Sequence, residues 1–460
     1  MAFSGTKDLT HGRPLRLVTG FALPLLFGVL FQQLYNFVDT AVVGRYLGAD
    51  MLGAVVATGS VNFLIVGFCL GICSGFSVPV SQRFGAGDLS EMRRFVMNGV
   101  YLAGVFGVIM GVTTAVLCPQ ILRLMNTPEE LMPYSCAYIR VIFAVIPVTM
   151  VYNMAAGILR ALGDSRTPVI FLIGAALINV GLDLLFILRF NMGVAGAAWA
   201  TGISQLFSGV GCVAVLVKKF TLLRPEGDEK RISPRHMKTL AGVGLPMGLQ
   251  FSITAIGTVV VQAAVNALGT ASVSAVAAGT KLSMLFTCVY DALSSTMATF
   301  AGQNLGAGRP DRINRGLGAA CLLGSVYSVA ATAVLFLFGE SLITLFVDAG
   351  ETAVIEKAMI YLRFNSALYL PLMAVNVFRL AIQGMGYTRV AMVAGVLEMA
   401  ARSVVALLMV PLYGYSAVCA ANPAAWVAAD LFLIPCYFEL LKKVKHMVEV
   451  NKDIERRKCK

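Results

Sequence analysis

Charged residues are scarce in this chain. Only 13% of its 460 residues are Asp, Glu, Lys or Arg, whereas 58% are hydrophobic and the mean hydropathy is +0.80. Soluble domains carry roughly 25% charged residues, so this composition excludes an ordinary soluble protein. A membrane span needs about 20 to 25 apolar residues, and about twelve such segments with their connections fit the length. The sequence therefore predicts an all-α polytopic membrane protein with twelve transmembrane helices.

Residues for metal and nucleophilic chemistry are few and poorly placed. The three histidines, His11, His236 and His446, fall at the margins of the predicted spans, and the ten cysteines form no CxxC pair. The spans contain no HExxH motif or paired His and Asp motif. We therefore expect no enzyme, no intramembrane histidine or zinc site and no cofactor other than a coupling ion.

The hydropathy pattern places the spans at these residues: 17–43, 52–80, 92–117, 131–157, 167–189, 193–217, 236–266, 273–300, 315–338, 354–382, 389–412 and 415–441. The first span is too long and too polar for a cleaved signal segment, so we expect the N-terminus to be retained.

Basic residues are distributed unevenly over the connections. One alternate set of loops and termini holds 27 Lys and Arg residues, whereas the opposite set holds Arg45, Arg123 and Arg189. This asymmetry follows the positive-inside rule and predicts that both termini are cytoplasmic. The formal charge of +12 then reflects topology and indicates no nucleic-acid partner. The basic tail, residues 442–460, is expected to contact anionic lipid headgroups.

The two halves of the chain repeat each other. Gln82 with Gly-Ala-Gly at 85–87 matches Gln303 with Gly-Ala-Gly at 306–308, a displacement of 221 residues. Two further pairs show nearly the same displacement. They are Leu-Pro at 23–24 and 245–246, and Leu-Gly at 47–48 and 268–269. An even number of spans is repeated, so the copies have the same orientation in the membrane. We predict an N-terminal six-helix lobe with the cation site (1–217), a solvated cytoplasmic linker (218–235), a C-terminal six-helix lobe (236–441) and the tail. The lobes are expected to face each other across a cavity.

The first span carries an unusual polar face. Gln32, Asn36 and Asp39 stack on one side of the helix, with Tyr35 beside them. Carboxylates are costly inside a membrane and are functional candidates where they occur. Pro24 removes one backbone donor, so this helix can bend. Asp39 is therefore the leading candidate for a functional residue.

Several motifs resemble the multidrug and toxic compound extrusion (MATE) family. They are the first-span pattern from Pro24 to Asp39, the two Gly-Ala-Gly loops, and Arg-Ala-Leu-Gly-Asp-Ser-Arg-Thr-Pro at 160–168. The likeness covers essentially all twelve spans and is closest to the DinF-like and MepA-like bacterial branch. It implies exchange of inward-moving Na⁺ or H⁺ for outward-moving organic, mostly cationic and amphipathic, compounds.

The resemblance also implies a cation site in the N-terminal lobe, formed by Asp39, Asn179, Asp183 and Thr201. Asn179 and Asp183 are four residues apart and therefore share a helix face. Two carboxylates, an amide oxygen and a hydroxyl form the hard oxygen set that Na⁺ prefers. Protons can occupy the same carboxylates, so the sequence leaves Na⁺ and H⁺ coupling open.

The C-terminal lobe departs from the NorM-like branch of the family. Its first helix contains Gln250 and Gln262 but no acid, which makes coupling through this lobe doubtful. Asp291 remains a candidate there, Glu398 and Arg402 are expected to neutralise each other at i, i+4, and Asp430 has no assigned role. The residues that we expect to contact substrate are Gln32, Tyr35, Asn36, Tyr152, Met154, Gln250, Phe251, Asp291 and Asn376.

The sequence thus favours a secondary active multidrug efflux transporter that works by alternating access of two lobes. The alternative is a flippase for lipid-linked precursors, although such proteins tend to have a cationic cavity and this chain buries acids. We expect a functional monomer in a bacterial-type plasma (inner) membrane, whose partners are small-molecule drugs or metabolites and the lipid bilayer.

Overall fold

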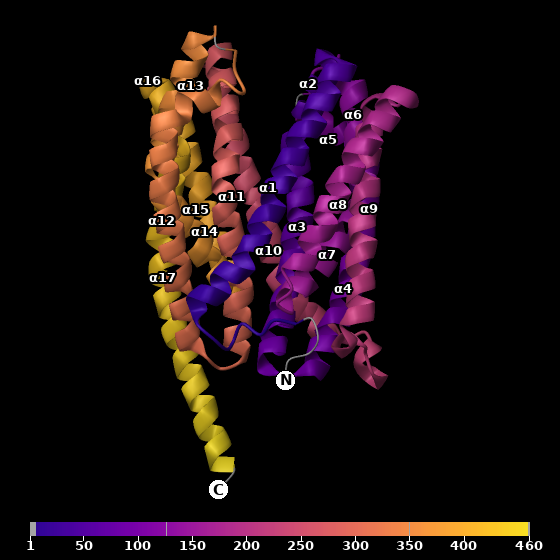
Figure 1. Cartoon of the computed structure of the whole chain (residues 1–460), viewed down its shortest axis with the longest axis vertical. Coiled ribbons are helices and arrows are strands. Elements are labelled where there is room, and N and C mark those ends of the chain that lie inside the picture. Colours follow the sequence, from indigo (N-terminus) through magenta and orange to yellow (C-terminus); the bar gives the residue numbers. More distant parts are fainter. Residues whose placement is uncertain (1–5, 126, 349, 459–460) are drawn as a thin grey trace. The chain divides into compact units, whose positions relative to one another are not determined.

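The computed structural model describes residues 6–125, 127–348 and 350–458, and every regular element within them is helical (Figure 1). The first half contains α1 (Pro14–Leu47), α2 (Ala49–Ala57), α3 (Gly59–Ala86), α4 (Leu89–Val116), α5 (Cys118–Leu124), α6 (Met132–Ala144), α7 (Ile146–Ala161), α8 (Arg166–Leu184), the π-helical turn η1 (Leu185–Arg189) and α9 (Gly193–Lys219). The 3₁₀ turns η2 (Thr221–Leu223) and η3 (Gly227–Lys230) follow. The second half contains α10 (Pro234–Asn266), α11 (Thr270–Gly306), α12 (Pro310–Ile343), α13 (Thr352–Ala367), α14 (Tyr369–Gly384), α15 (Thr388–Val404), the π-helical turn η4 (Val405–Met409), α16 (Val410–Tyr413) and α17 (Tyr415–Lys458).

Ten of the described helical segments are long and apolar enough to cross a membrane, and two bent helix pairs raise the number to twelve if each pair is one span. The pairs are α6 with α7, bent by 46°, and α13 with α14, bent by 52°. Pro147 and Pro371 follow the two breaks, and proline lacks the N–H that would continue the helical hydrogen bonds. The predicted twelve-helix membrane fold is confirmed, and each half bends its fourth span.

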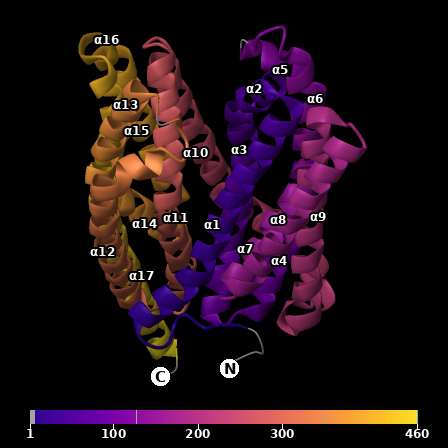
Figure 2. The same ribbon diagram turned by 45° about the horizontal axis from the view of Figure 1, so that its top comes forward.

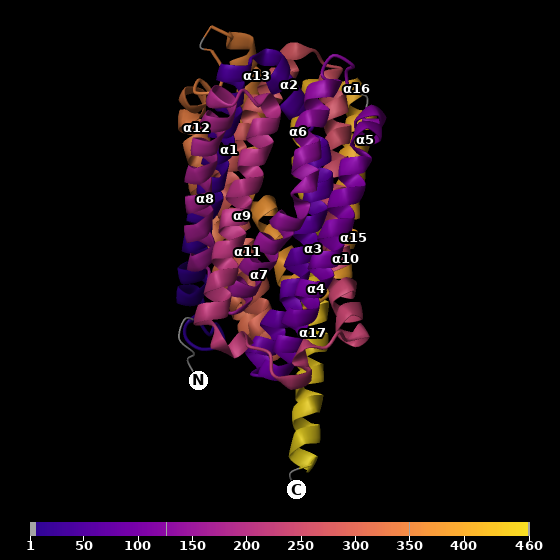
Figure 3. The same cartoon turned by 90° about the vertical axis from the view of Figure 1, so that its right-hand side faces the viewer.

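The described residues form two compact units. The N-terminal unit contains Leu23–Ser252 and the described residues before Leu9, and the C-terminal unit contains Leu9–Ala22 with the described residues from Ile253 onward. Figure 2 shows the helices of both units, coloured along the sequence, and α1 and α10 each contribute to both units. The units divide inside α1 and α10, whereas the lobes predicted from the repeat divide at 218–235. In Figure 3, α17 continues past the other helices of its unit, and residues 459–460 of the predicted tail lie outside the described residues.

Glycine allows close packing inside the N-terminal unit. A Cβ atom at Gly71 would lie 2.6 Å from the Met247 carbonyl oxygen, and one at Gly75 would lie 2.5 Å from the Gly244 Cα atom. Small residues let helix backbones approach in membranes, where apolar contact with lipid already satisfies larger side chains. The first part of α10 is therefore held against α3.

The C-terminal unit is built around α11, which packs on α12, α13 and α14. Tyr290 of α11 makes edge contacts with Tyr327 and Tyr369, with ring centroids 5.7 and 5.8 Å apart, and its hydroxyl pairs with the Ser328 hydroxyl at 2.8 Å. A buried tyrosine needs such a partner for its hydroxyl. This cluster fixes α11, α12 and α14 in one packing arrangement.

The repeated Gln and Gly-Ala-Gly loop of the C-terminal unit binds the backbone that precedes α1. Gln303 Oε1 accepts the Leu9 N–H at 2.9 Å, Asn304 Nδ2 donates to the Leu9 carbonyl at 3.2 Å, and Arg309 Nη1 donates to the Thr10 carbonyl at 2.8 Å. These side chains satisfy backbone groups that no helix satisfies. In this unit the motif therefore anchors the backbone that precedes α1.

Most residues of the linker are exposed, as expected of a solvated segment, but a few of its side chains anchor it on α4. Glu229 of η3 is only 6% exposed and forms a two-point ion pair with Arg93, and Asn98 accepts the Ser233 N–H at 2.8 Å. Phe220 and Leu222 are also buried. The polar composition predicts a solvated linker. The two apolar side chains and the ion pair with Arg93 nevertheless hold parts of the linker against the neighbouring helices.

Candidate functional site

The candidate cation site lies in the N-terminal unit, where α1 and α8 come together. A Cβ atom at Gly28 of α1 would touch the Val169 side chain of α8, so the two helices pass close to each other. Asp39 is half-buried on α1, whereas Asn179 and Asp183 on α8 are 1% and 0% exposed. The four-residue spacing on α8 places both side chains on the same helix face, as predicted.

The structure brings the four residues of the predicted site together. The carboxyl groups of Asp39 and Asp183 lie close enough to each other to share a proton. In the amide orientation that satisfies its neighbours, Asn179 donates to Asp183 Oδ2 at 3.2 Å and accepts the backbone N–H of Thr201 at 3.2 Å. The Thr201 hydroxyl donates to the Ala197 carbonyl at 3.0 Å, so its lone pairs remain available.

The site leaves oxygen atoms without partners. Asp39 Oδ1 and Asp183 Oδ1 are buried and accept no hydrogen bond from any described residue. A hydrogen bond between two carboxyl groups requires a shared proton, because two carboxylates in close contact repel each other. The four side chains supply oxygen ligands and no sulfur or imidazole, which suits Na⁺. The arrangement can therefore hold a proton or an alkali cation.

Two tyrosines flank the carboxyl pair. Tyr35 of α1 and Tyr138 of α6 both lie within electrostatic range of Asp39 and Asp183. Tyr35 was predicted from the polar face of the first span. Tyr138 was not predicted, because a tyrosine in an apolar span does not reveal which distant residues it contacts. The π-helical turn η1 begins two residues after Asp183, and such turns are frequent at functional sites.

The nine predicted substrate contacts lie in several separate places. Gln32 and Asn36 are exposed on α1, beside Tyr35. Buried Met154 lines an apolar cavity of about 390 Å³ between α4, α7 and α9, whereas Tyr152 is half-buried and is not one of its lining residues. Gln250 is buried on α10, and Phe251 packs over Gly67 with its Cβ 3.6 Å from the position of a Cβ there. Asp291 and Asn376 both line a cavity of the C-terminal unit.

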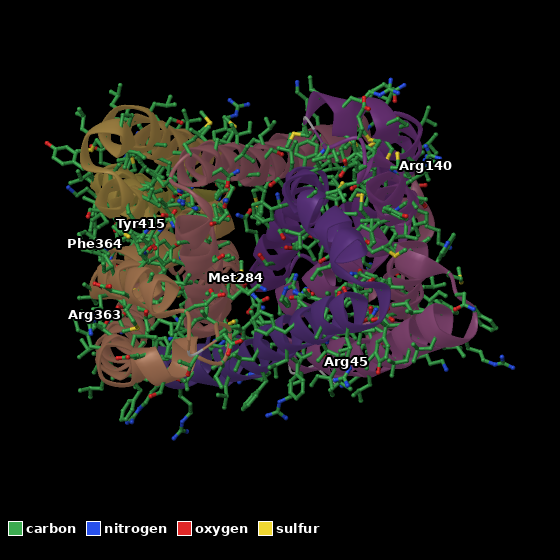
Figure 4. The ribbon with its side chains drawn as sticks, turned by 90° about the horizontal axis from the view of Figure 1, so that it is seen from above. Arg45, Arg140, Met284, Arg363, Phe364 and Tyr415 are labelled. Atoms are coloured by element: carbon green, nitrogen blue, oxygen red, sulfur yellow. The ribbon has the colours of Figure 1, made fainter. Side chains whose placement is uncertain are left out.

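This second cavity has a volume of about 310 Å³ and a mixed polar and aromatic lining. Met284 of α11, which is labelled in Figure 4, lines it together with Tyr361, Tyr369 and Trp426. Glu398 of α15 pairs with Arg402 at 3.7 Å, as expected, but also with Arg379 of α14. This second partner was not predicted, because Arg379 lies 19 positions before Glu398 and on a different helix.

The fold and the site define a multi-pass helical membrane protein with two repeated halves and a buried pair of carboxyl groups. The sequence profile of the MatE family matches residues 24–185 and 246–408, and the chain belongs to this family. The chain is 29% identical over 374 residues to the probable multidrug resistance protein YpnP of Bacillus subtilis (strain 168), which covers 80% of this chain and 82% of YpnP. It is 26% identical to a FAD transporter of Shewanella oneidensis, over 80% of this chain and 81% of that protein.

Solved structures agree with this fold. An outward-facing multidrug resistance MATE family transporter superposes with a TM-score of 0.88 at 20% sequence identity, over 97% of this chain and all of that one. At this identity the likeness concerns the fold. The two matched regions correspond to the two repeats found in the sequence.

Proposed function

We propose that this protein is a secondary active multidrug efflux transporter that exchanges Na⁺ or H⁺ inward for organic compounds outward, by alternating access of its two lobes. The observation that carries the proposal is the contact between the carboxyl groups of Asp39 and Asp183, which lie on different helices of one unit. Family membership and relatives named for multidrug resistance support the same function.

The coupling follows from competition for negative charge. Two buried carboxyl groups need a positive partner, which is a proton, Na⁺ or the cationic part of a substrate. When the ion and the substrate exclude each other, entry of one accompanies release of the other. A membrane potential contributes about 2.3 kcal/mol per charge per 100 mV to this exchange. Asp39, Asn179, Asp183 and Thr201 are the proposed ligands of the coupling ion, and no further cofactor is proposed.

Everted membrane vesicles test this function. We expect an imposed Na⁺ or pH gradient to drive ethidium transport by the wild-type protein, and Asp39→Asn and Asp183→Asn to abolish it. Normal transport by both variants would show that the site assignment is wrong. Transport measured against Na⁺ concentration at clamped pH separates Na⁺ coupling from H⁺ coupling.

Of two other substrate classes, one is favoured by a particular observation and one is not. The relatives do not favour the lipid-linked flippase, and the acids of the candidate site are unsuited to a pyrophosphate group. One relative bears the name FAD transporter, so a flavin dinucleotide is a second candidate. Its transport can be measured by flavin fluorescence in the same vesicles.

We further propose a monomer in a bacterial plasma membrane with both termini in the cytoplasm. The bacterial relatives and the distribution of basic residues support this placement. Modification of a single cysteine introduced near either terminus by a membrane-impermeant reagent would test the orientation.

A further inference from the structure

The C-terminal unit buries three charged side chains next to its cavity. Arg379, Glu398 and Arg402 are 7%, 2% and 5% exposed, and all three line the 310 Å³ cavity. Glu398 pairs with both arginines, and Arg402 Nε donates to Asn422 Oδ1 at 3.1 Å. Asp430 interacts electrostatically with Arg379 but does not line the cavity. This part of the cavity wall therefore carries two guanidinium groups and one carboxylate, that of Glu398.

These arginines retain donors without acceptors. Arg379 Nε and Arg402 Nη1 are buried and donate to no described residue. Buried polar groups are almost always satisfied, and arginine donors match the oxygens of a carboxylate especially well. An anionic group that entered the cavity would meet the two guanidinium groups in its wall.

The charged cluster lies in the same part of the repeat as the cation site of the N-terminal unit. Asn179 and Asp183 are four residues apart on α8, and Asp183 is two residues before the π-helical turn η1. Glu398 and Arg402 are four residues apart on α15, and Arg402 is three residues before the π-helical turn η4. The two pairs are therefore one residue out of register with each other. Both units carry charge just before a π turn, but the cluster of the C-terminal unit contains two arginines.

An acid lies elsewhere on the wall of the same cavity. Asp291 of α11 lines the cavity, is exposed there, and forms no ion pair with a described basic residue. Tyr361, Tyr369 and Trp426 provide aromatic surface between polar groups. Sites of about 300 to 1,000 Å³ with an apolar lining and a few polar groups are typical of small-molecule binding.

We propose that this cavity binds zwitterionic organic compounds. The substrate's carboxylate pairs with the guanidinium groups of Arg379 and Arg402 in the cavity wall, and its cationic group pairs with Asp291. Glu398 and Asn422 hold the two guanidinium groups in position. This inference rests on the proposed efflux function and specifies one class of its substrates.

A carboxyl-bearing rhodamine and its methyl ester test the proposal, because they share the cationic ring system and differ only in the anionic group. We expect the wild-type protein to transport both dyes in everted vesicles. Arg402→Gln should lower the transport of the acid about tenfold relative to that of the ester, the size expected for one lost charged hydrogen bond. Asp291→Asn should lower the transport of both dyes. Arg363→Gln, on the neighbouring helix α13 and outside the cavity lining, is the matched control (Figure 4).

The possible failures are distinguishable. Equal loss of both dyes in Arg402→Gln would overturn the zwitterion proposal, whereas the absence of gradient-driven transport of either dye by the wild-type protein would overturn the efflux function. A binding measurement does not depend on folding of the Arg402 variant. Trp199→Phe leaves Trp426, in the cavity wall, as the only tryptophan of the full chain. We expect the acid to quench Trp426 fluorescence at a lower concentration than the ester, and equal quenching would contradict the proposal.

Discussion

Arg93 and Glu229 form a two-point ion pair between α4 and the linker, with Nε to Oε2 at 2.6 Å and Nη2 to Oε1 at 3.0 Å. Burial by itself would raise the pKa of the Glu229 carboxyl, but the hydrogen bonds from Arg93 and from the Glu226 N–H outweigh it and lower the pKa from 4.5 to about 2. A carboxyl with a depressed pKa stabilises the folded arrangement above its ordinary pKa.

The docked linker should therefore be acid-sensitive. Its stabilisation by Glu229 is complete above about pH 4.5 and is lost as the pH falls towards about 2, because the carboxyl must then take up a proton. Glu229→Gln should release the linker at neutral pH. Hydrogen exchange at the Ser233 amide, which donates to Asn98, reports the release. Asp228→Asn is the control, since Asp228 forms only an exposed pair with Arg231, and equal exchange in both variants would refute this assignment.

Close packing of α3 and α10 should make Gly75 intolerant of a side chain. Gly75→Ala places a Cβ atom 2.5 Å from the Gly244 Cα atom, so the helices must separate. Overpacking of this kind costs about 1 to 3 kcal/mol. Gly104→Ala on α4 meets no atom within 4 Å and serves as the control. Thermal unfolding in detergent should show a lower midpoint for Gly75→Ala alone.

Gly163 should be intolerant of alanine for a different reason. Its φ of 87° is left-handed, and a Cβ atom there would collide with the carbonyl group of Lys7. Gly87 also has a left-handed φ, of 73°, but no atom lies within 4 Å of a Cβ added there. Gly87→Ala should therefore lower the free energy of unfolding only by the conformational cost of roughly 1 to 2 kcal/mol. Gly163→Ala should lower the unfolding midpoint further than Gly87→Ala. Equal shifts would show that the contact with Lys7 contributes nothing.

Cys118 and Cys136 should form a disulfide under oxidation. Their sulfur atoms are 3.3 Å apart, on α5 and α6, although 18 residues separate them in the sequence. Mild oxidation of the intact protein should remove two free thiols, which mass spectrometry of proteolytic fragments detects. Cys118→Ser should prevent this. Cys69 and Cys73 lie one turn apart on α3 and are the internal comparison, because i, i+4 side chains of a straight helix are poorly placed for a disulfide.

Hydropathy and repetition predicted most of the fold. The apolar segments indicated the twelve spans, and the Gly-Ala-Gly repeat indicated two similar halves. Both patterns can be recognised without knowledge of which helices contact each other. The bends at Pro147 and Pro371 and the docking of Glu229 were not predicted. The prolines at the bends are visible in the sequence but were not interpreted as breaks within a span. The docking of Glu229 depends on its contact with Arg93 of another helix, which composition does not encode.

The candidate site was predictable only in part. Spacing alone places Asn179 and Asp183 on one helix face, but their contact with Asp39 came from the family resemblance. Tyr138 and the pairing of Arg379 with Glu398 were missed, because no periodicity links residues on separate helices. The roles of all these residues in transport stay predictions until variants are measured.

The π-helical turns change the direction of the side chains beside the charged residues of both units. They begin at Leu185 and at Val405, at similar places in the two repeats. A π turn accommodates one more residue than an α turn. The residues after each turn therefore face a different direction from the one that a continuous α-helix would give them. In both units the last part of the helix is turned away from the face that carries the polar pair.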